Sequence, residues 1–382
     1  MINLADIWRA AAAAADWRTG IRRWTHSPIV DVAFISNMRD SVDRKRFLGS
    51  WHPPEGHFNA NRFRIHGVSG MLRCLDIVTE DLVEAAGREK ARTHFISAVE
   101  WAEKSGVRVV LLAASTKRLF GEDGSELKRR FPHVLFTIGD NGTILLLREE
   151  TLRALNGSRL QPGSARIGIL GPYGLLGGIM TKAMVDRGFD VIGAGPNEEG
   201  LSEIRGKFGI PVCRTFAEMG KVDAVVACTH SEKIRLSADN VDLVRQPGKK
   251  LLVIDVAEPS NLRRREYEKC KDRVIRQDAG NAYAPSLKYV LGVFSYRLLR
   301  LTRGVTFGCF AEALSLACAL NRGEDIRKYD WLKVNESNMS VVAELFRKDG
   351  FAIPSPRCFG KKVRSFCVEL NNEQSEHQKH WR

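Results

Sequence analysis

The chain has 382 residues, of which 44% are hydrophobic and 27% are charged, an ordinary globular composition with room for two or three domains. Its net charge of +14 at pH 7 suits an acidic partner or a phosphorylated substrate, or is simply a solvated basic surface. Aromatic residues do not interleave with the basic ones, so we expect no nucleic-acid binding. No apolar run approaches the roughly 20 residues that span a bilayer, which predicts no transmembrane segment.

The N-terminus and the cysteines both favour a cytoplasmic protein. Ala10–Ala15 is flanked by Arg9 and Asp16, so the pattern is not that of a signal peptide. The eight cysteines are scattered and form no C-x-x-C pair, which is typical of free thiols in a reducing compartment. His52 and His57 flank a Pro-Pro-Glu-Gly loop, and no spacing of ligand residues predicts a metal site.

In chain order, residues 1–28 form an extension, with a short helix expected over Leu4–Trp24. Residues 29–160 alternate between apolar runs and amphipathic stretches, which predicts an α/β domain. The expected strands are Ile29–Ser36, Val107–Ala113 and Val134–Ile138, and the expected helices are Glu80–Ser105 and Thr143–Leu155. The segment 157–164, which contains Pro162, indicates a linker.

Residues 165–280 are organised around a strand that runs into Gly171, Gly174 and Gly177, followed by a helix over Leu175–Arg187. The first glycine permits a tight turn, the second leaves room for a pyrophosphate, and the third lets helix and strand pack. Free N–H groups at the helix N-terminus would hold phosphate oxygens. Further strands are expected at Asp190–Gly195, Val222–Cys228 and Leu251–Val256. We therefore predict a Rossmann-type dinucleotide-binding domain.

Residues 281–370 form a helical C-terminal segment, and residues 371–382 a polar tail with frayed ends. Helices are expected at Ser286–Leu301, Phe307–Leu320 and Ser337–Lys348. In the second of these, Cys309 and Glu312 share one face. A carboxylate there orients a neighbour or shuttles protons if it is buried. The alternative, which the residues alone favour, is that Glu312 faces solvent and Cys309 fills the core.

Several segments are similar to those of the cyanobacterial long-chain acyl-[acyl-carrier-protein] reductases. Phe307-Gly-Cys-Phe-Ala-Glu-Ala313 resembles their Phe-Ala-Cys-Phe-Ala-Glu-Ala segment, and Leu252–Leu262 resembles their strand-Asp-x-x-x-Pro-x-Asn-Leu segment. The glycine turn lies where they carry Gly-Ala-Thr-Gly-Asp-Ile-Gly, and Phe136–Thr143 where they carry Phe-Thr-Thr-Gly-Asn-Thr-His-Thr. Order and spacing agree from about residue 100 to residue 355.

The resemblance implies reduction of a fatty acyl thioester to an aldehyde, with NADPH as cofactor and NADH not excluded. It implies an acyl-binding domain over 29–160, the Rossmann domain, and a nucleophile at Cys309. The acyl donor would be acyl carrier protein or acyl-CoA. A thiolate is a good nucleophile and leaving group, and its place near the start of a helix suits a lowered pKa.

The chain departs from this family at Gly142, where the family carries His, and after the second Rossmann strand, where the family often carries Arg. Asn197 is expected to bond the ribose, while Glu198 and Glu199 would repel a 2′-phosphate. Asp255 ends the fourth strand, where it contacts the cofactor or caps the following turn.

Three more residues follow predicted strands. His230 either donates a proton to a developing oxyanion or lies in a surface loop, and the second reading is favoured. Asp140 and Thr143 lie at a strand end that we expect to face the substrate. The candidate catalytic residues are therefore Cys309, Glu312 and His230, and the candidate substrate-binding residues are Asp140 and Thr143.

Two other functions fit the residues. A two-domain dehydrogenase resembling shikimate dehydrogenase would transfer hydride directly to a small carbonyl or hydroxyl substrate, and its activity would be insensitive to thiol alkylation. A catalytically silent nucleotide-binding scaffold would bind the cofactor without turnover.

Overall fold

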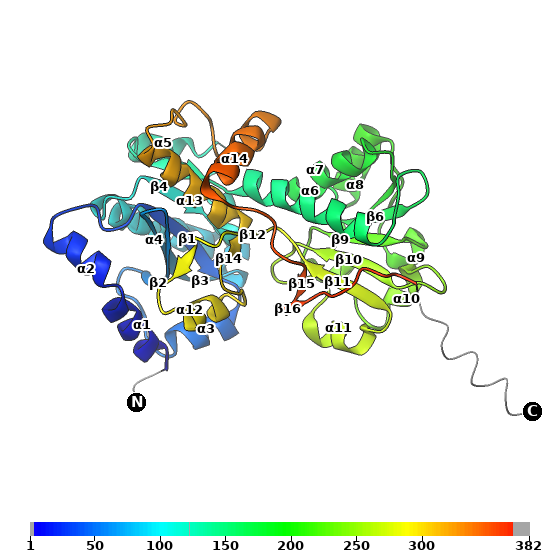
Figure 1. The fold of residues 1–382 in the computed structure, drawn as a ribbon, viewed down its shortest axis with the longest axis horizontal. Helices are drawn as coiled ribbons and strands as arrows, with labels where there is room; N and C mark the ends of the chain where they lie inside the picture. The colour runs from blue at the N-terminus through cyan, green and yellow to red at the C-terminus, as the bar shows by residue number, and fades with distance from the viewer. Residues whose placement is uncertain (1–3, 122, 370–382) are drawn as a thin grey trace, which may run out of the picture. The chain divides into compact units, whose positions relative to one another are not determined.

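The computed structural model describes residues 4–121 and 123–369 (Figure 1). The chain divides into two compact units, here the first unit (Met1–Leu145 and Asn281–Pro354) and the second unit (Leu146–Gly280 and Ser355–Arg382). This division falls inside one helix instead of at the expected linker, and it joins residues 281–354 to the first unit. The expected polar tail lies outside the described residues.

The first unit contains a six-stranded mixed sheet in the order β13-β2-β3-β1-β4-β5. Strands β1, β3, β4 and β5 run parallel to one another, whereas β2 is antiparallel to β3 and to β13. The strands are β1 (Val32–Met38), β2 (His57–Ile65), β3 (Val68–Val78), β4 (Val109–Leu112), β5 (Leu135–Thr137) and β13 (Lys288–Tyr289), with a separate pair β12 (Asn281–Tyr283) and β14 (Val305–Phe307).

The helices of the first unit come from the stretch before residue 145 and from the stretch after residue 280. They are α1 (Leu4–Ala15), α2 (Trp17–Trp24), α3 (Ser41–Leu48), η1 (Glu80–Val83), α4 (Ala85–Lys104), η2 (Ala114–Arg118), α5 (Ser125–Arg130), α12 (Val293–Leu298), α13 (Gly308–Asn321) and α14 (Glu336–Asp349). Helices α13 and α14 lie side by side (Figure 1). Helix α6 (Asp140–Gly157) contains the boundary between the units.

Several expected elements of the first unit differ from those observed. The single helix expected over Leu4–Trp24 is two helices, because the buried carboxylate of Asp16 accepts hydrogen bonds from Thr19 (2.6 Å) and Arg62 (2.7 Å) where the chain turns. The expected helix over Ser286–Leu301 is a short strand followed by a short helix, because Lys288–Tyr289 pairs with the edge of β2. Strands β2 and β3 were not expected.

Helix α13 packs its apolar face on the sheet of the first unit. The ring of Phe310 stacks on that of Phe34 from β1, with centroids 4.3 Å apart, and meets the ring of Phe63 from β2 edge-on at 5.7 Å. Almost every residue of α13 is buried. The helix that carries the cysteine segment is therefore part of the core of the first unit.

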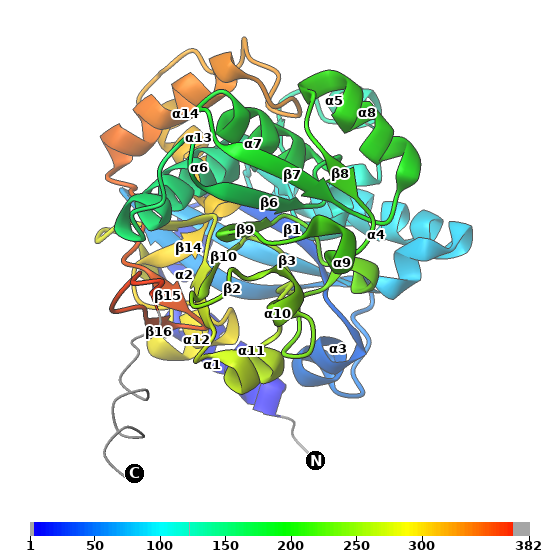
Figure 2. The ribbon, with the colours of Figure 1, turned by 90° about the vertical axis from the view of Figure 1, so that its right-hand side faces the viewer.

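The second unit contains a six-stranded parallel sheet in the order β11-β10-β9-β6-β7-β8. Numbered along the chain from β6, this is the 3-2-1-4-5-6 order of the Rossmann fold, as expected. Figure 2 shows β6, β7 and β8 side by side. The strands are β6 (Arg166–Leu170), β7 (Asp190–Ala194), β8 (Val212–Cys213), β9 (Ala224–Ala227), β10 (Leu251–Asp255) and β11 (Val274–Asp278).

Helices cover both faces of this sheet, with α7 and α8 on one side and α10 and α11 on the other (Figure 1). The elements are α7 (Leu175–Val185), α8 (Glu198–Phe208), α9 (Phe216–Met219), η3 (Glu232–Ile234), α10 (Val241–Val244), α11 (Arg264–Cys270), and the returning hairpin β15 (Arg357–Cys358) and β16 (Lys361–Lys362). Within the described residues, no helix has both the length and the hydropathy to cross a membrane.

Candidate functional site

Cys309 is the second residue of α13, and it lies against the turn that joins β5 to α6. The glycine of that turn, Gly139, has a φ of +70°, which a side chain would strain. A Cβ added to Gly139 would lie 2.3 Å from the Cβ of Cys309. Glycine is therefore required for the close approach of this turn to the cysteine.

An ion pair between a half-buried lysine and a buried aspartate lies close enough to Cys309 to affect its ionisation. The ammonium of Lys117 pairs with the carboxylate of Asp140 at the start of α6. Burial acts to lower the pKa of Lys117, but the charge interactions with Asp140 and Cys309 outweigh burial, so that pKa is raised. Lys117 stays charged at neutral pH. Sequence reasoning missed this residue, whose only signal is a lone lysine following an apolar strand.

The thiol of Cys309 is protonated at neutral pH in this structure. Burial raises its pKa to about 11; Lys117 opposes the rise, whereas Asp140 and Glu312 add to it. The helix N-terminus therefore does not by itself create a thiolate. Any reaction of Cys309 requires that its proton be removed as the substrate arrives.

Glu312 is fully buried one turn further along α13, so the solvent-facing alternative does not describe it. Its carboxylate accepts hydrogen bonds from the hydroxyl of Thr137 (2.5 Å) and the backbone N–H of Gly142 (2.7 Å). Burial raises the pKa of Glu312 to about 7, against the effect of these two hydrogen bonds. A Cβ at Gly142 would lie 2.9 Å from the carbonyl oxygen of Gly308, so this position has no space for the family's histidine.

The structure brings four of the predicted residues to one place within the first unit. Cys309, Glu312, Asp140 and Thr143 all lie on α13 or on the first turn of α6. The hydroxyl of Thr143 donates to the carbonyl oxygen of Gly139 (3.1 Å), so it stabilises the turn on which the cysteine rests.

The predicted glycines lie at the carboxyl end of β6 in the second unit, and their geometry fits a dinucleotide. Gly171 has a φ of +76°. A Cβ on Gly177 would lie 2.0 Å from the carbonyl oxygen of Gly171, so helix and strand pack as closely as the motif predicts. Gly174 is the N-cap residue of α7 and provides no side-chain cap, which leaves the first N–H groups of the helix available to a phosphate.

The carboxyl end of β7 carries groups that sequence reasoning missed. The ring of Tyr173 lies against Gly195, and its hydroxyl accepts a hydrogen bond from the backbone N–H of Asn197 (3.4 Å). Arg214 directly follows β8 and pairs with Glu198 (3.1 Å). No arginine follows β7 directly in the sequence. Because β7 and β8 are parallel neighbours, Arg214 lies at the same carboxyl edge of the sheet as the residues that follow β7. The side chain of Asn197 caps α8.

Asp255 is buried at the end of β10, where it stabilises the following turn. Its carboxylate accepts hydrogen bonds from the N–H groups of Asn261 (3.2 Å) and Leu262 (3.1 Å) and pairs with Arg276 (2.9 Å). Burial opposes the charge of Arg276, but Asp255 and Asp278 raise its pKa above the ordinary value. Contact of Asp255 with a cofactor stays a prediction.

His230 lies in the loop after β9 and is exposed. Its side chain makes no hydrogen bond or ion pair with another described residue, and only its carbonyl oxygen accepts a hydrogen bond, from Arg235 (2.7 Å). This placement agrees with the surface-loop reading. A proton-transfer role for His230 stays a prediction.

Comparison with known proteins supports a nicotinamide-dependent class. Residues 166–259 match the family described as NADP oxidoreductase, coenzyme F420-dependent. Together with the strand order and the glycine turn, this match defines the second unit as a Rossmann-type domain of the NAD(P)-dependent oxidoreductase class, and it supports NADPH as the cofactor. The chain matches no curated protein.

Solved structures match this chain at low identity and with TM-scores below 0.5. L-tryptophan dehydrogenase from Nostoc punctiforme is 9% identical, with 84% of this chain and 80% of that chain covered and a TM-score of 0.38. Shikimate 5-dehydrogenase from Thermus thermophilus is 16% identical, with 56% and 62% covered and a TM-score of 0.28. The nucleotide-binding domain of glutamyl-tRNA reductase from Thermoplasma volcanium is 17% identical, with 36% and 84% covered and a TM-score of 0.26. None of these matches concerns an acyl-[acyl-carrier-protein] reductase, so that resemblance stays a prediction.

Proposed function

We propose that the protein reduces an acyl thioester to an aldehyde with NADPH, using Cys309 as the nucleophile. The observation that carries the proposal is the cluster at the start of α13, where Cys309 rests on Gly139 beside the Lys117–Asp140 ion pair. The resemblance of the cysteine segment to acyl-[acyl-carrier-protein] reductases supports the same assignment.

In the first half of the reaction, Sγ of Cys309 bonds to the carbonyl carbon of the thioester. The bond from that carbon to the donor's sulfur breaks, and the donor leaves as a thiol with the proton that Cys309 lost. In the second half, a hydride adds to the same carbon, its bond to Sγ breaks, and Sγ takes a proton from solvent. NADPH, bound at the glycine turn, would supply that hydride. The sum is thioester, NADPH and a proton giving aldehyde, thiol and NADP⁺.

The residues around the cysteine have separate roles in this proposal. The ammonium of Lys117 favours negative charge on Sγ and on the carbonyl oxygen as they develop it. Asp140 holds Lys117 and accepts the thiol proton during the attack. Glu312 is a positioning residue that joins α13 to Thr137 and Gly142 through its two hydrogen bonds.

The charge of the chain favours an acidic acyl donor. A net charge of +14 attracts both the acidic surface of an acyl carrier protein and the phosphates of CoA. We therefore propose these two carriers as the acyl donors to be compared.

A second candidate function is favoured by the protonated state of Cys309. In a direct dehydrogenase, Lys117 would donate a proton to the carbonyl oxygen of a small substrate while hydride adds to the carbonyl carbon. The half-buried Lys117, held by the buried carboxylate of Asp140, is a suitable acid–base group for that step. Cys309 would then only fill space beside Gly139.

Intact-protein mass spectrometry separates the two candidates. The protein is mixed, without nicotinamide, with thioesters of acyl carrier protein and of CoA that span short to long chains. We expect an acyl mass increment that is absent in Cys309→Ala but present in Cys318→Ala, a matched control because Cys318 is a buried cysteine of the same helix.

The thioester mechanism is contradicted if the protein forms no acyl adduct and Cys309→Ala still reduces its substrate. If no adduct forms and reduction of a small carbonyl survives in Cys309→Ala but is lost in Lys117→Met, the direct dehydrogenase replaces the thioester mechanism. Cofactor binding with no turnover of either substrate class would leave the nucleotide-binding scaffold.

A further inference from the structure

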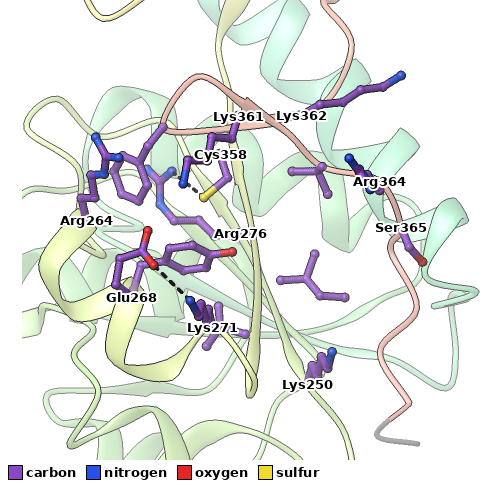
Figure 3. Close-up of a pocket in the computed structure, with 15 residues that line it drawn as sticks. Lys250, Arg264, Glu268, Lys271, Arg276, Cys358, Lys361, Lys362, Arg364 and Ser365 are labelled. Carbon is purple, nitrogen blue, oxygen red and sulfur yellow. Dashed lines mark hydrogen bonds and ion pairs between the residues drawn. The ribbon is translucent and has the colours of Figure 1, made fainter.

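The second unit contains a cavity of about 290 Å³ that none of the predicted site residues lines. Its walls come from Lys250, which directly precedes β10, from helix α11 and the turn after it, and from the returning segment 358–365 (Figure 3). Val274, the first residue of β11, also lines it. The cavity thus extends along the edge strand β11, from its first residue Val274 to Arg276, and the glycines of the dinucleotide turn are not part of its lining.

The rim of this cavity is strongly basic, and most of its charge is uncompensated. Five of its cations form no ion pair with any described residue: Lys250, Arg264, Lys361, Lys362 and Arg364. The single acidic residue of the wall, Glu268, pairs with Lys271 (3.4 Å). Like charges gathered around one concavity repel one another and attract an anion.

The floor of the cavity is held in place by the buried side chain of Arg276, whose charge is already paired. The guanidinium of Arg276 lies 3.9 Å from the ring centroid of Phe359 and pairs with Asp278 (2.5 Å) as well as with Asp255. The ring of Tyr267 lies beside that of Phe359, with centroids 5.9 Å apart. The charge of Arg276 is therefore more than compensated by two carboxylates, and the positive charge that faces a ligand belongs to the rim.

We propose that this cavity binds a small phosphorylated ligand that carries a diphosphate or two neighbouring phosphates. Its volume lies at the lower end of the roughly 300–1,000 Å³ of ligand pockets, which suits a compact anion better than a whole dinucleotide. Lysine and arginine are the usual partners of phosphate oxygens. This inference does not depend on the proposed reaction.

Calorimetric titration with inorganic diphosphate tests the proposal, with NADPH present at saturation in a parallel titration to occupy the glycine turn, where a pyrophosphate would also bind. The variant is Lys361→Gln/Arg364→Gln. The matched control is Lys182→Gln/Lys269→Gln, which lowers the net charge equally at exposed lysines of the same unit outside the cavity. We expect the first variant to lose about tenfold or more in affinity, and the control to stay within about twofold.

Two further arms identify the ligand and the site. Titration with NADPH present at saturation should leave diphosphate binding unchanged, and affinity should fall with added salt. If adenosine diphosphate binds more tightly than diphosphate and loses that gain in the variant, the ligand is a nucleotide. Equal affinities assign the site to the phosphate groups alone.

Three results would overturn the proposal. They are no binding of diphosphate to the unmodified protein, equal binding by the two double variants, and displacement of diphosphate by NADPH. Binding of an acidic carrier protein at this face without any binding of diphosphate would also overturn it, in favour of a protein-docking surface. Circular dichroism melting curves establish that both double variants are folded.

Discussion

The buried carboxyl of Glu312 gives the protein a pH dependence of stability with a defined sign. Its ordinary pKa of 4.5 is raised to about 7 in the fold because the side chain is buried. Between these values the folded protein holds a proton that the unfolded chain has released. The free energy of unfolding therefore falls as the pH rises through this window.

The size of the effect follows from the two pKa values. The difference between 4.5 and about 7 corresponds to about 3 kcal/mol, since one pKa unit is about 1.4 kcal/mol. Glu312→Gln does not titrate, so it removes the dependence. We expect the unfolding free energy of the unmodified protein, relative to that of Glu312→Gln, to fall by about 3 kcal/mol between about pH 4 and about pH 8.

Urea unfolding curves at closely spaced pH values measure this difference, and Glu324→Gln provides a control of opposite sign. Partial burial acts to raise the pKa of Glu324, but the ion pairs with Arg322 (2.6 Å) and Lys348 (3.1 Å) outweigh burial and lower that pKa. Its contribution to stability is present above the ordinary pKa and is lost as the pH falls. If the unfolding free energy of the unmodified protein, relative to that of Glu312→Gln, stays constant or rises with pH, the reasoning is refuted.

Two other substitutions test one feature of each unit: the close packing of Gly139 on Cys309 in the first unit, and the role of Arg214 in NADPH binding in the second. Gly139→Ala should lower the melting temperature and slow alkylation of Cys309; its cost is about 1–2 kcal/mol for the backbone and about 1–3 kcal/mol for the clash. Gly67→Ala, at a φ of +82° with nothing within 4 Å, should show only the first cost, and equal losses would argue against the contact. Arg214→Ser should weaken NADPH binding about tenfold but leave NADH binding unchanged, as measured by cofactor fluorescence. An equal loss for both cofactors would count against a role for Arg214 at the 2′-phosphate.

The parts of the fold that were predicted correctly have local signals. The Rossmann turn was predicted from Gly171, Gly174 and Gly177 together with the apolar strand before them, the helix after them and the further strands that follow. The strands β6, β7, β9 and β10 are continuous apolar runs, as expected for a parallel sheet covered on both faces. Strand β2 was missed because its apolar alternation changes phase, from Phe58 and Ala60 to Phe63 and Ile65, where its pairing with β3 is irregular.

The candidate site likewise has some features with a local sequence signal and others that depend on the fold. Cys309 and Glu312 are three residues apart on one helix, so their proximity is visible in the sequence. Lys117 joins them only because β4 and β5 are parallel neighbours, which places the residues that follow them at one edge. The burial that raises the pKa of Glu312 likewise depends on packing between α13 and the turn before α6, which no local pattern specifies.

The path of the chain restricts how this protein can be taken apart. The chain passes between the two units at residues 145–146, 280–281 and 354–355, so each unit is built from two separated stretches. A fragment ending at residue 280 would keep the glycine turn but lose Cys309 and the returning wall of the basic cavity. A separately expressed dinucleotide-binding half would need residues 146–280 joined to the segment that begins at Ser355. A truncation at residues 280–281 would therefore damage both units at once, because each unit has a stretch on either side of that point.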